Sequence, residues 1–333
     1  MKFGEFGIFP VSDGFFRLDG GAMFGVVPRV LWEKRAPPDA KNRIRMGLWC
    51  LLIQAAGKNI LVNTGIGNKY TLRFNEIYGI KHPPSLISSL AEHNVKPTDI
   101  DMVILTHLHF DHCGGNTVYQ DPDAGLAYPR SSPLLPAFPN ARYIVQEAEW
   151  QRAVNPNERT RASYIRENII PIRDAGLLDL IEGNKELLPP PPPAPPGEAS
   201  EGVALRPAPL SLKRGEGEPR PVGREVRPNG GGVSVRVTGG HTRGHQIVFI
   251  ESGGKKAVFW SDLIPTTAHL DLPYIMSYDL FPEETLEEKK HLVEQAISEK
   301  WLCFWEHDPV VNCGYIQRNE EGRPVVQPIS EKP

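Results

Sequence analysis

Residues 106–115 read Thr106-His107-Leu108-His109-Phe110-Asp111-His112-Cys113-Gly114-Gly115. Four side chains that bind metals, three imidazoles and one carboxylate, fall within six residues, directly after the short apolar run 100–105. In an extended segment His107 and His109 point the same way, because side chains alternate with a period of two. They can therefore bind one cation together, whereas a turn after them directs Asp111 and His112 towards a second cation. The chain holds only ten histidines in 333 residues, so this pattern indicates a metal centre rather than a chance surface loop.

Three later strand-like runs each end on a further possible ligand. His241 follows the run that starts at Gly232, Asp262 follows the run that ends at Trp260, and His307 follows the run 301–305. Loops at strand ends carry functional residues on a rigid scaffold, so we expect these side chains to join the first cluster. Asp262 offers a carboxylate that can bridge two cations. Neutral imidazoles and carboxylates suit Zn2+, and also Mn2+ or Fe2+.

The strings His107-x-His109-x-Asp111-His112, Gly240-His241, Ser261-Asp262 and His307 together resemble the metallo-β-lactamase-fold hydrolase superfamily. The resemblance covers almost the whole chain outside a proline-rich insertion. It implies an α/β (α+β) chain folded as an αββα four-layer sandwich, with two sheets packed face to face and helices outside. It also implies two divalent metal ions. His107, His109 and His241 would hold one ion, Asp111, His112 and His307 would hold the other, and Asp262 would bridge them.

Two residues depart from the family pattern. The family often has an aspartate before Thr64-Gly65 that orients a metal ligand, whereas this chain has Asn63, which accepts a hydrogen bond but adds no charge. The family usually has glycine before the bridging aspartate, and this chain has Ser261. We expect neither change to abolish the site. His245 is predicted to support a ligand or to pack, and Cys113 to be a small packing residue.

The rest of the chain predicts one layered α/β domain over residues 1–333. The expected strands are 3–9, 15–18, 47–54, 60–63, 100–105, 143–145, 177–181, 232–237, 246–251, 257–260 and 301–305, and the expected helices are 84–94, 147–154, 161–168 and 283–300. Gly20-Gly21 is typical of a tight turn. From about 188 to 232 the chain is rich in proline and poor in large apolar residues. This composition predicts a disordered insertion.

The bulk composition narrows the class of protein. A formal net charge of −3 offers no basic field for nucleic acid or an anionic membrane. We expect no signal peptide, and no apolar run is long enough to span a membrane. Four cysteines without a C-x-x-C pair fit free thiols in a reducing cytoplasm. The sequence therefore predicts a cytoplasmic protein with a small-molecule substrate, without nucleic-acid or membrane partners, and compatible with a homodimer.

The predicted chemistry is hydrolysis. A hydroxide that bridges two cations forms near neutral pH, because coordination lowers the pKa of water to about 7. It would attack a carbonyl or phosphoryl centre, with Asp111 and Asp262 as catalytic residues and Asp111 as a proton relay. The chain looks most like the branch with quorum-quenching lactonases and methyl-parathion-type hydrolases. This resemblance favours a lactone, an ester or a phosphotriester as the substrate.

An aromatic-rich segment, Thr266 to Phe281, follows Asp262 and is expected to form a wall of the site. Its candidate substrate-binding residues are His269, Tyr274 and Tyr278, with Met23, Phe24 and Trp32 on the opposite side. Two other enzyme classes remain alternatives. One is a mononuclear iron persulfide dioxygenase, and the other is a glyoxalase II-like thioesterase, which the lack of a basic C-terminal helical domain disfavours. A binding protein without activity is disfavoured by the complete set of ligands.

Overall fold

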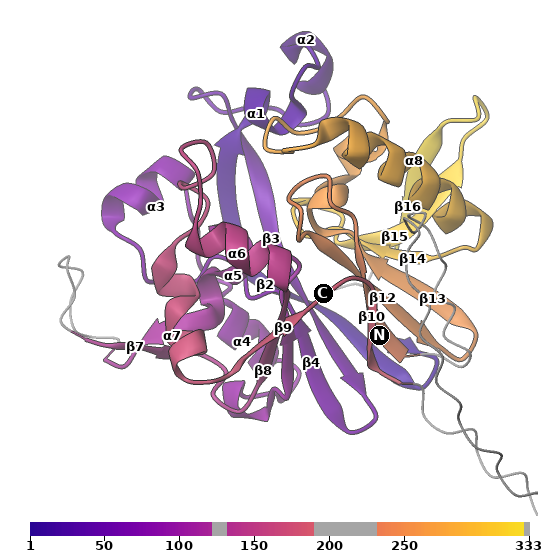
Figure 1. Ribbon diagram of the computed structural model, residues 1–333. Coiled ribbons are helices and arrows are strands. Elements are labelled where there is room, and N and C mark those ends of the chain that lie inside the picture. The colour runs from indigo at the N-terminus through magenta and orange to yellow at the C-terminus, as the bar shows by residue number, and fades with distance from the viewer. Residues whose placement is uncertain (122–131, 190–231, 330–333) are drawn as a thin grey trace, which may run out of the picture.

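The computed structural model describes residues 1–121, 132–189 and 232–329, and two seven-stranded sheets dominate it (Figure 1). The first sheet has the order β1 (Lys2–Phe3), β2 (Phe6–Asp19), β3 (Arg43–Ala55), β4 (Lys58–Val62), β5 (Met102–Ile104), β8 (Arg142–Gln146), β9 (Leu178–Ile181). The second has the order β10 (Lys185–Leu188), β11 (Gly232–Val237), β12 (Gln246–Ser252), β13 (Lys255–Phe259), β14 (Leu302–Phe304), β15 (Cys313–Arg318), β16 (Pro324–Pro328). A small ribbon pairs β6 (Thr117–Tyr119) with β7 (Leu134–Pro136).

Helices cover the outer faces of both sheets (Figure 1). The helices in the described residues are α1 (Gly20–Phe24), α2 (Arg29–Trp32), α3 (Leu72–Tyr78), α4 (Leu86–Ala91), α5 (Phe110–Cys113), α6 (Glu147–Val154), α7 (Ile170–Asp174) and α8 (Pro282–Ser298). Apolar residues of α4, α6 and α7 pack on the outer face of the first sheet, and those of α8 pack on the second. In the described residues, no helix is both long and apolar enough to cross a membrane.

The central strands are apolar on both faces because each face is covered. In β3, Leu51 and Ile53 enter the core between the two sheets, whereas Cys50 and Leu52 face the helices. In β12, Val248 and Ile250 likewise enter the core between the sheets. Alternate residues of one strand thus pack in two separate cores. The three layers of apolar contact confirm the predicted αββα sandwich.

Most predicted elements are confirmed, including the hairpin of β3 and β4 and the long helix α8. Two local predictions are wrong. Gly20-Gly21 opens α1 instead of a tight turn, because the Asp19 side chain accepts a hydrogen bond from the Ala22 amide and caps a helix. The expected helix 161–168 is reduced to a 3-10 turn over Arg166–Asn168. The sequence analysis also missed β15 and β16, which complete the second sheet.

The predicted proline-rich insertion lies almost entirely outside the described residues, which stop at 189 and resume at 232. The strands on either side of this gap, β10 and β11, are antiparallel neighbours, with Lys185 opposite Val235. The chain therefore returns after residues 190–231 to the sheet that it left.

The core between the sheets should dominate the stability of this fold. Ile250 is fully buried there, so Ile250→Ala should lower the free energy of unfolding by about 2–5 kcal/mol. Val310 is 83% exposed, and Val310→Ala should change it by less than about 0.5 kcal/mol. Urea denaturation of both variants measures the difference. Equal effects would contradict the assignment of Ile250 to the core.

Candidate metal centre

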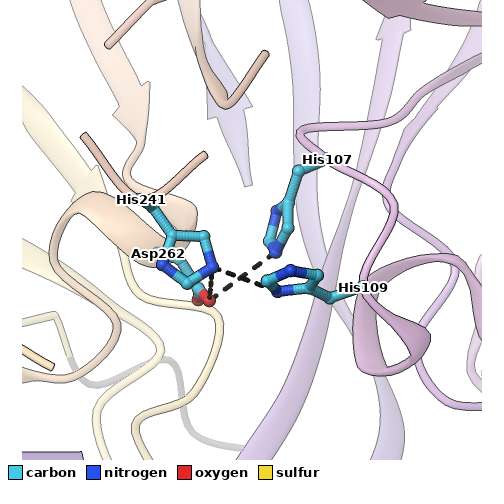
Figure 2. Close-up of side chains that lie close together, drawn as sticks. All are labelled: His107, His109, His241 and Asp262. Atoms are coloured by element: carbon cyan, nitrogen blue, oxygen red, sulfur yellow. Dashed lines mark hydrogen bonds and ion pairs between the residues drawn. The ribbon is translucent and has the colours of Figure 1, made fainter. Parts of the chain in front are cut away.

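The side chains of the first group of predicted ligands point towards one another (Figure 2). His107 and His109 follow β5, His241 follows β11, and Asp262 lies in a 3-10 turn directly after β13. One ligand atom from each of these four residues lies within 4.8 Å of the others. Segments from both sheets thus direct imidazoles and a carboxylate towards a common point.

The second group consists of Asp111, His112 and His307, and its ligand atoms also lie within 4.8 Å of one another. Asp111 and His112 belong to α5, whereas His307 follows β14. Asp262 lies between the two groups. Its Oδ2 is 3.1 Å from Nε2 of His241, and its Oδ1 is 3.3 Å from Nε2 of His307. One carboxylate oxygen therefore faces each group, the placement expected of a bridging ligand.

The hydrogen bonds of the histidines leave bare nitrogen lone pairs facing one another. His307 Nδ1 lies 2.9 Å from the Gly47 carbonyl oxygen, and His112 Nδ1 lies 2.9 Å from a Glu306 carboxylate oxygen. Both acceptors require the proton on Nδ1, so in the neutral rings each Nε2 carries a lone pair. These two Nε2 atoms are only 3.1 Å apart. Such an arrangement is repulsive unless a proton or a cation lies between them.

In the first group, two ring nitrogens also face each other. His241 Nδ1 lies 2.7 Å from the Asp279 carboxylate, which leaves its Nε2 to face His109 Nδ1 at 3.1 Å. Within the described residues, neither His107 Nε2 nor Asp262 Oδ1 has a hydrogen-bond partner, although both are buried. Buried polar atoms are seldom left unpaired. The donor set, five imidazoles and two carboxylates, therefore fits two divalent cations of the zinc type.

Burial and charge set the protonation of the cluster in opposite directions. Burial, reinforced by neighbouring imidazoles, holds the pKa of His107 and His109 well below the ordinary value. Burial also works against a charge on His112, but Glu306 and the site aspartates raise its pKa well above the usual range. Burial disfavours the charged form of Asp262 too, yet the surrounding histidines hold its pKa well below normal. Asp262 is therefore an ionised carboxylate, which is the form that binds a cation.

Glu306 is a functional candidate that the sequence analysis missed. It is fully buried, and its carboxylate lies 2.9 Å from His112 Nδ1. The two departures from the family pattern both donate to it, Asn63 from Nδ2 at 2.7 Å and Ser261 from Oγ at 3.2 Å. Ser261 has φ of 46°, a left-handed conformation that favours glycine. Glu306 thus supplies the negative charge that Asn63 lacks.

Glu149 and His245 also hold the loops of the site in place. Glu149 of α6 is fully buried, and it accepts hydrogen bonds from the Leu108 amide and from the Thr242 hydroxyl. It therefore ties the loop of His107 to the loop of His241. His245 accepts a hydrogen bond from the Asp262 amide at 3.2 Å, a supporting role in line with its prediction. Glu149 lies in a polar helical segment and His245 in a glycine-rich loop, so the sequence alone gives no signal for these contacts.

The glycines after the histidine cluster permit a close approach of the backbone. A Cβ atom at Gly114 would lie 2.1 Å from the Ile66 carbonyl oxygen, which is impossible without a shift of the chain. Cys113 is buried, and desolvation raises the pKa of its thiol to about 12. It packs as a neutral side chain, as predicted.

The predicted substrate wall has a different arrangement from the expected one. Met23, Phe24 and Trp32 do not face the segment 266–281 across a cavity but join it in one apolar cluster. His269 is buried in this cluster, stacks on Phe24 at 4.6 Å and uses both ring nitrogens, with Thr266 and with the Met23 carbonyl. Tyr274 packs edge-on against Phe24. His269 and Tyr274 are therefore packing residues that support the segment 266–281.

Lys289 of α8 fixes that wall from inside the protein. Its ammonium group donates to the carbonyls of His269, Asp271 and Tyr274 at 2.8, 2.8 and 2.9 Å. Burial lowers its pKa to about 7. Tyr278 lies further along the same segment and lines a cavity beside His109. Tyr278 is therefore the predicted substrate residue that faces open space.

An αββα sandwich whose edge gathers two groups of buried imidazoles and carboxylates defines a metal-dependent hydrolase. The family model of the metallo-beta-lactamase superfamily matches residues 45–307, and the chain belongs to this superfamily. The match spans every residue of both ligand groups.

The individual relatives have low sequence identity to this chain. The chain is 24% identical over 280 residues to an N-acyl homoserine lactonase of Bacillus cereus, a match that covers 80% of this chain and 83% of that protein. A crystal structure of a probable metal-dependent hydrolase from Staphylococcus aureus has a TM-score of 0.75 and 29% identity, over 99% of this chain and all of that one. A dizinc quorum-quenching lactonase, AidC, has a TM-score of 0.69 and 19% identity, over 100% and 97% of the two chains. This last similarity shows the fold alone.

The charge of Glu306 should strengthen metal binding through His112. Glu306→Gln keeps the shape but removes the charge, and it should weaken zinc binding by about 10–100-fold, the usual cost of losing such a partner. Competition with a chromophoric chelator measures the affinity. Unchanged affinity in this variant would contradict the role of Glu306.

A second substitution separates charge from packing. Asn63→Asp in the Glu306→Gln background moves the carboxylate across a 2.7 Å contact and should restore most of the affinity. Asn63→Asp alone sets two carboxylates against each other, so it should destabilise the metal-free protein.

Proposed function

We propose that this chain is a dinuclear zinc hydrolase that cleaves a small-molecule ester, lactone or phosphotriester. The observation that carries the proposal is the position of Asp262, which presents one oxygen to each of two complete ligand groups. His107, His109 and His241 would hold one cation, Asp111, His112 and His307 the other, and Asp262 both. When bound, such a pair of cations supplies a water of lowered pKa and polarises the substrate oxygen.

The choice of substrate class rests on chemistry and on the relatives. Similarity to N-acyl homoserine lactonases over four-fifths of the chain favours attack at a carbonyl carbon, as in a lactone or an ester. The identity of 24% is too low to transfer a particular lactone, and a phosphotriester stays within the proposal. In each case water adds to the electrophilic centre and one single bond to oxygen breaks.

Two side chains of the protein have direct tasks in this proposal. Asp111 Oδ2 lies 3.6 Å from His307 Nε2, at the edge of the cluster, where it can take a proton and pass it to the leaving oxygen. Burial raises the pKa of Tyr278, so its hydroxyl stays protonated and can donate to a substrate oxygen.

The second ligand group favours a hydrolase over the mononuclear oxygenase alternative. An enzyme with a single iron needs only one set of ligands, whereas here Asp111, His112 and His307 form a second set within 4.8 Å. The two ligand groups do not distinguish oxygen esters from thioesters, so substrate tests must decide between the proposed hydrolase and a thioesterase of the glyoxalase II type.

Turnover of a para-nitrophenyl ester, a lactone, a phosphotriester and a glutathione thioester tests the function. We expect hydrolysis of one of the first three, and Asp262→Asn should reduce kcat/KM by more than about 100-fold, beyond the cost of losing a supporting residue. Asp174→Asn is the matched control, since that side chain is 59% exposed and should leave turnover unchanged. Hydrolysis that survives Asp262→Asn, or oxygen consumption without hydrolysis, would refute the proposal.

A further inference from the structure

A cavity of about 250 Å³ opens directly beside His109. Its lining consists of His109, Arg159, Thr160, Ser163, Ser277, Tyr278 and Leu280. Two separate segments form its walls, residues 159–163 on one side and 277–280 on the other. Whatever occupies this space lies against the first ligand group.

Both walls are fastened to the metal centre by backbone hydrogen bonds. The Ser163 carbonyl accepts from the amide of Phe110, the residue after His109, at 2.9 Å. The Leu280 amide donates to the His241 carbonyl at 3.1 Å. Arg159 joins the walls, because its guanidinium donates to the Ser277 carbonyl at 2.7 Å. The cavity is therefore held at a fixed place relative to the candidate ligands.

The cavity offers hydrogen-bond donors that the protein itself does not use. In the part of the chain that the structure describes, Arg159 has no carboxylate partner, and the hydroxyls of Ser163 and Tyr278 have no hydrogen-bond partner. No aspartate or glutamate lines the cavity among the described residues. Burial and the nearby Asp111 raise the pKa of Tyr278, so its hydroxyl remains a donor. The cavity therefore offers one guanidinium and two unengaged hydroxyls as donors, in a lining that is otherwise largely apolar.

We propose that this cavity binds a carboxylate of the substrate, so that the enzyme prefers esters or lactones that carry an acidic group. The proposal rests on the proposed hydrolase function. A guanidinium with free N–H groups is the side chain best suited to a carboxylate, and hydroxyls complete its coordination. With the carboxylate at Arg159, the acyl carbon a few bonds away lies towards His109. The oxygen of water then bonds to that carbon, the bond from the acyl carbon to the leaving oxygen breaks, and the leaving group takes a proton.

A matched pair of substrates tests the preference. The para-nitrophenyl hemisuccinate carries a carboxylate, and para-nitrophenyl butyrate is a neutral ester of similar length. We expect kcat/KM to favour the hemisuccinate, mainly through KM. Arg159→Met should reduce that preference about tenfold, the size expected for one charge-assisted hydrogen bond. Arg161→Met is the control, because Arg161 is exposed like Arg159 but does not line the cavity.

Succinate binding keeps the proposal separate from the hydrolase function. Calorimetry on the metal-loaded protein should show succinate binding that Arg159→Met weakens about tenfold and Arg161→Met leaves unchanged. If the wild-type protein hydrolyses both esters equally and Arg159→Met changes neither preference nor succinate binding, the inference is wrong while the proposed function stands. If neither ester is cleaved but succinate binding depends on Arg159, the cavity is an anion site and the hydrolase proposal fails for esters.

Discussion

The convergence of buried nitrogen lone pairs is the constraint on which the rest of the site depends. His112 and His307 each commit one ring nitrogen to a buried acceptor, and their other nitrogens meet at 3.1 Å. On the other side of Asp262, His241 commits Nδ1 to the Asp279 carboxylate, and its Nε2 meets His109 Nδ1 at 3.1 Å. A protein interior does not keep such contacts without compensation. The site is therefore organised around positive charge that its histidines and aspartates must share.

The candidate metal ligands also connect the two sheets of the sandwich. His107, His109, Asp111 and His112 follow a strand of the first sheet, whereas His241, Asp262 and His307 follow strands of the second. A cation bound by residues of both sheets fastens one edge of the molecule, and its binding free energy adds to the stability of the fold. Glu149 and Glu306 reinforce the same edge, because each contacts loops that belong to different sheets.

The sequence predicted the features that depend on residues close together in the chain. Alternation of apolar residues in strands such as β3 indicated layers, and the cluster from His107 to His112 marked the site. The substrate-binding residues of the wall were harder to predict from the sequence. His269 lies in an aromatic-rich segment because it packs there, and both of its ring nitrogens are engaged away from the cavity. Glu306, Asp279 and Glu149 were missed since their roles arise from contacts between distant segments. The helix predicted over residues 161–168 does not form at its start, where the Ser163 carbonyl accepts a hydrogen bond from the Phe110 amide.

The metal content of the purified protein tests the central claim most directly. Elemental analysis of the folded chain, before and after dialysis against a chelator and readdition of zinc, gives the number and identity of bound ions. Two zinc ions per chain, with one lost in His307→Ala and both weakened in Asp262→Ala, would agree with a shared dinuclear centre. A single iron per chain, unaffected by His307→Ala, would contradict it.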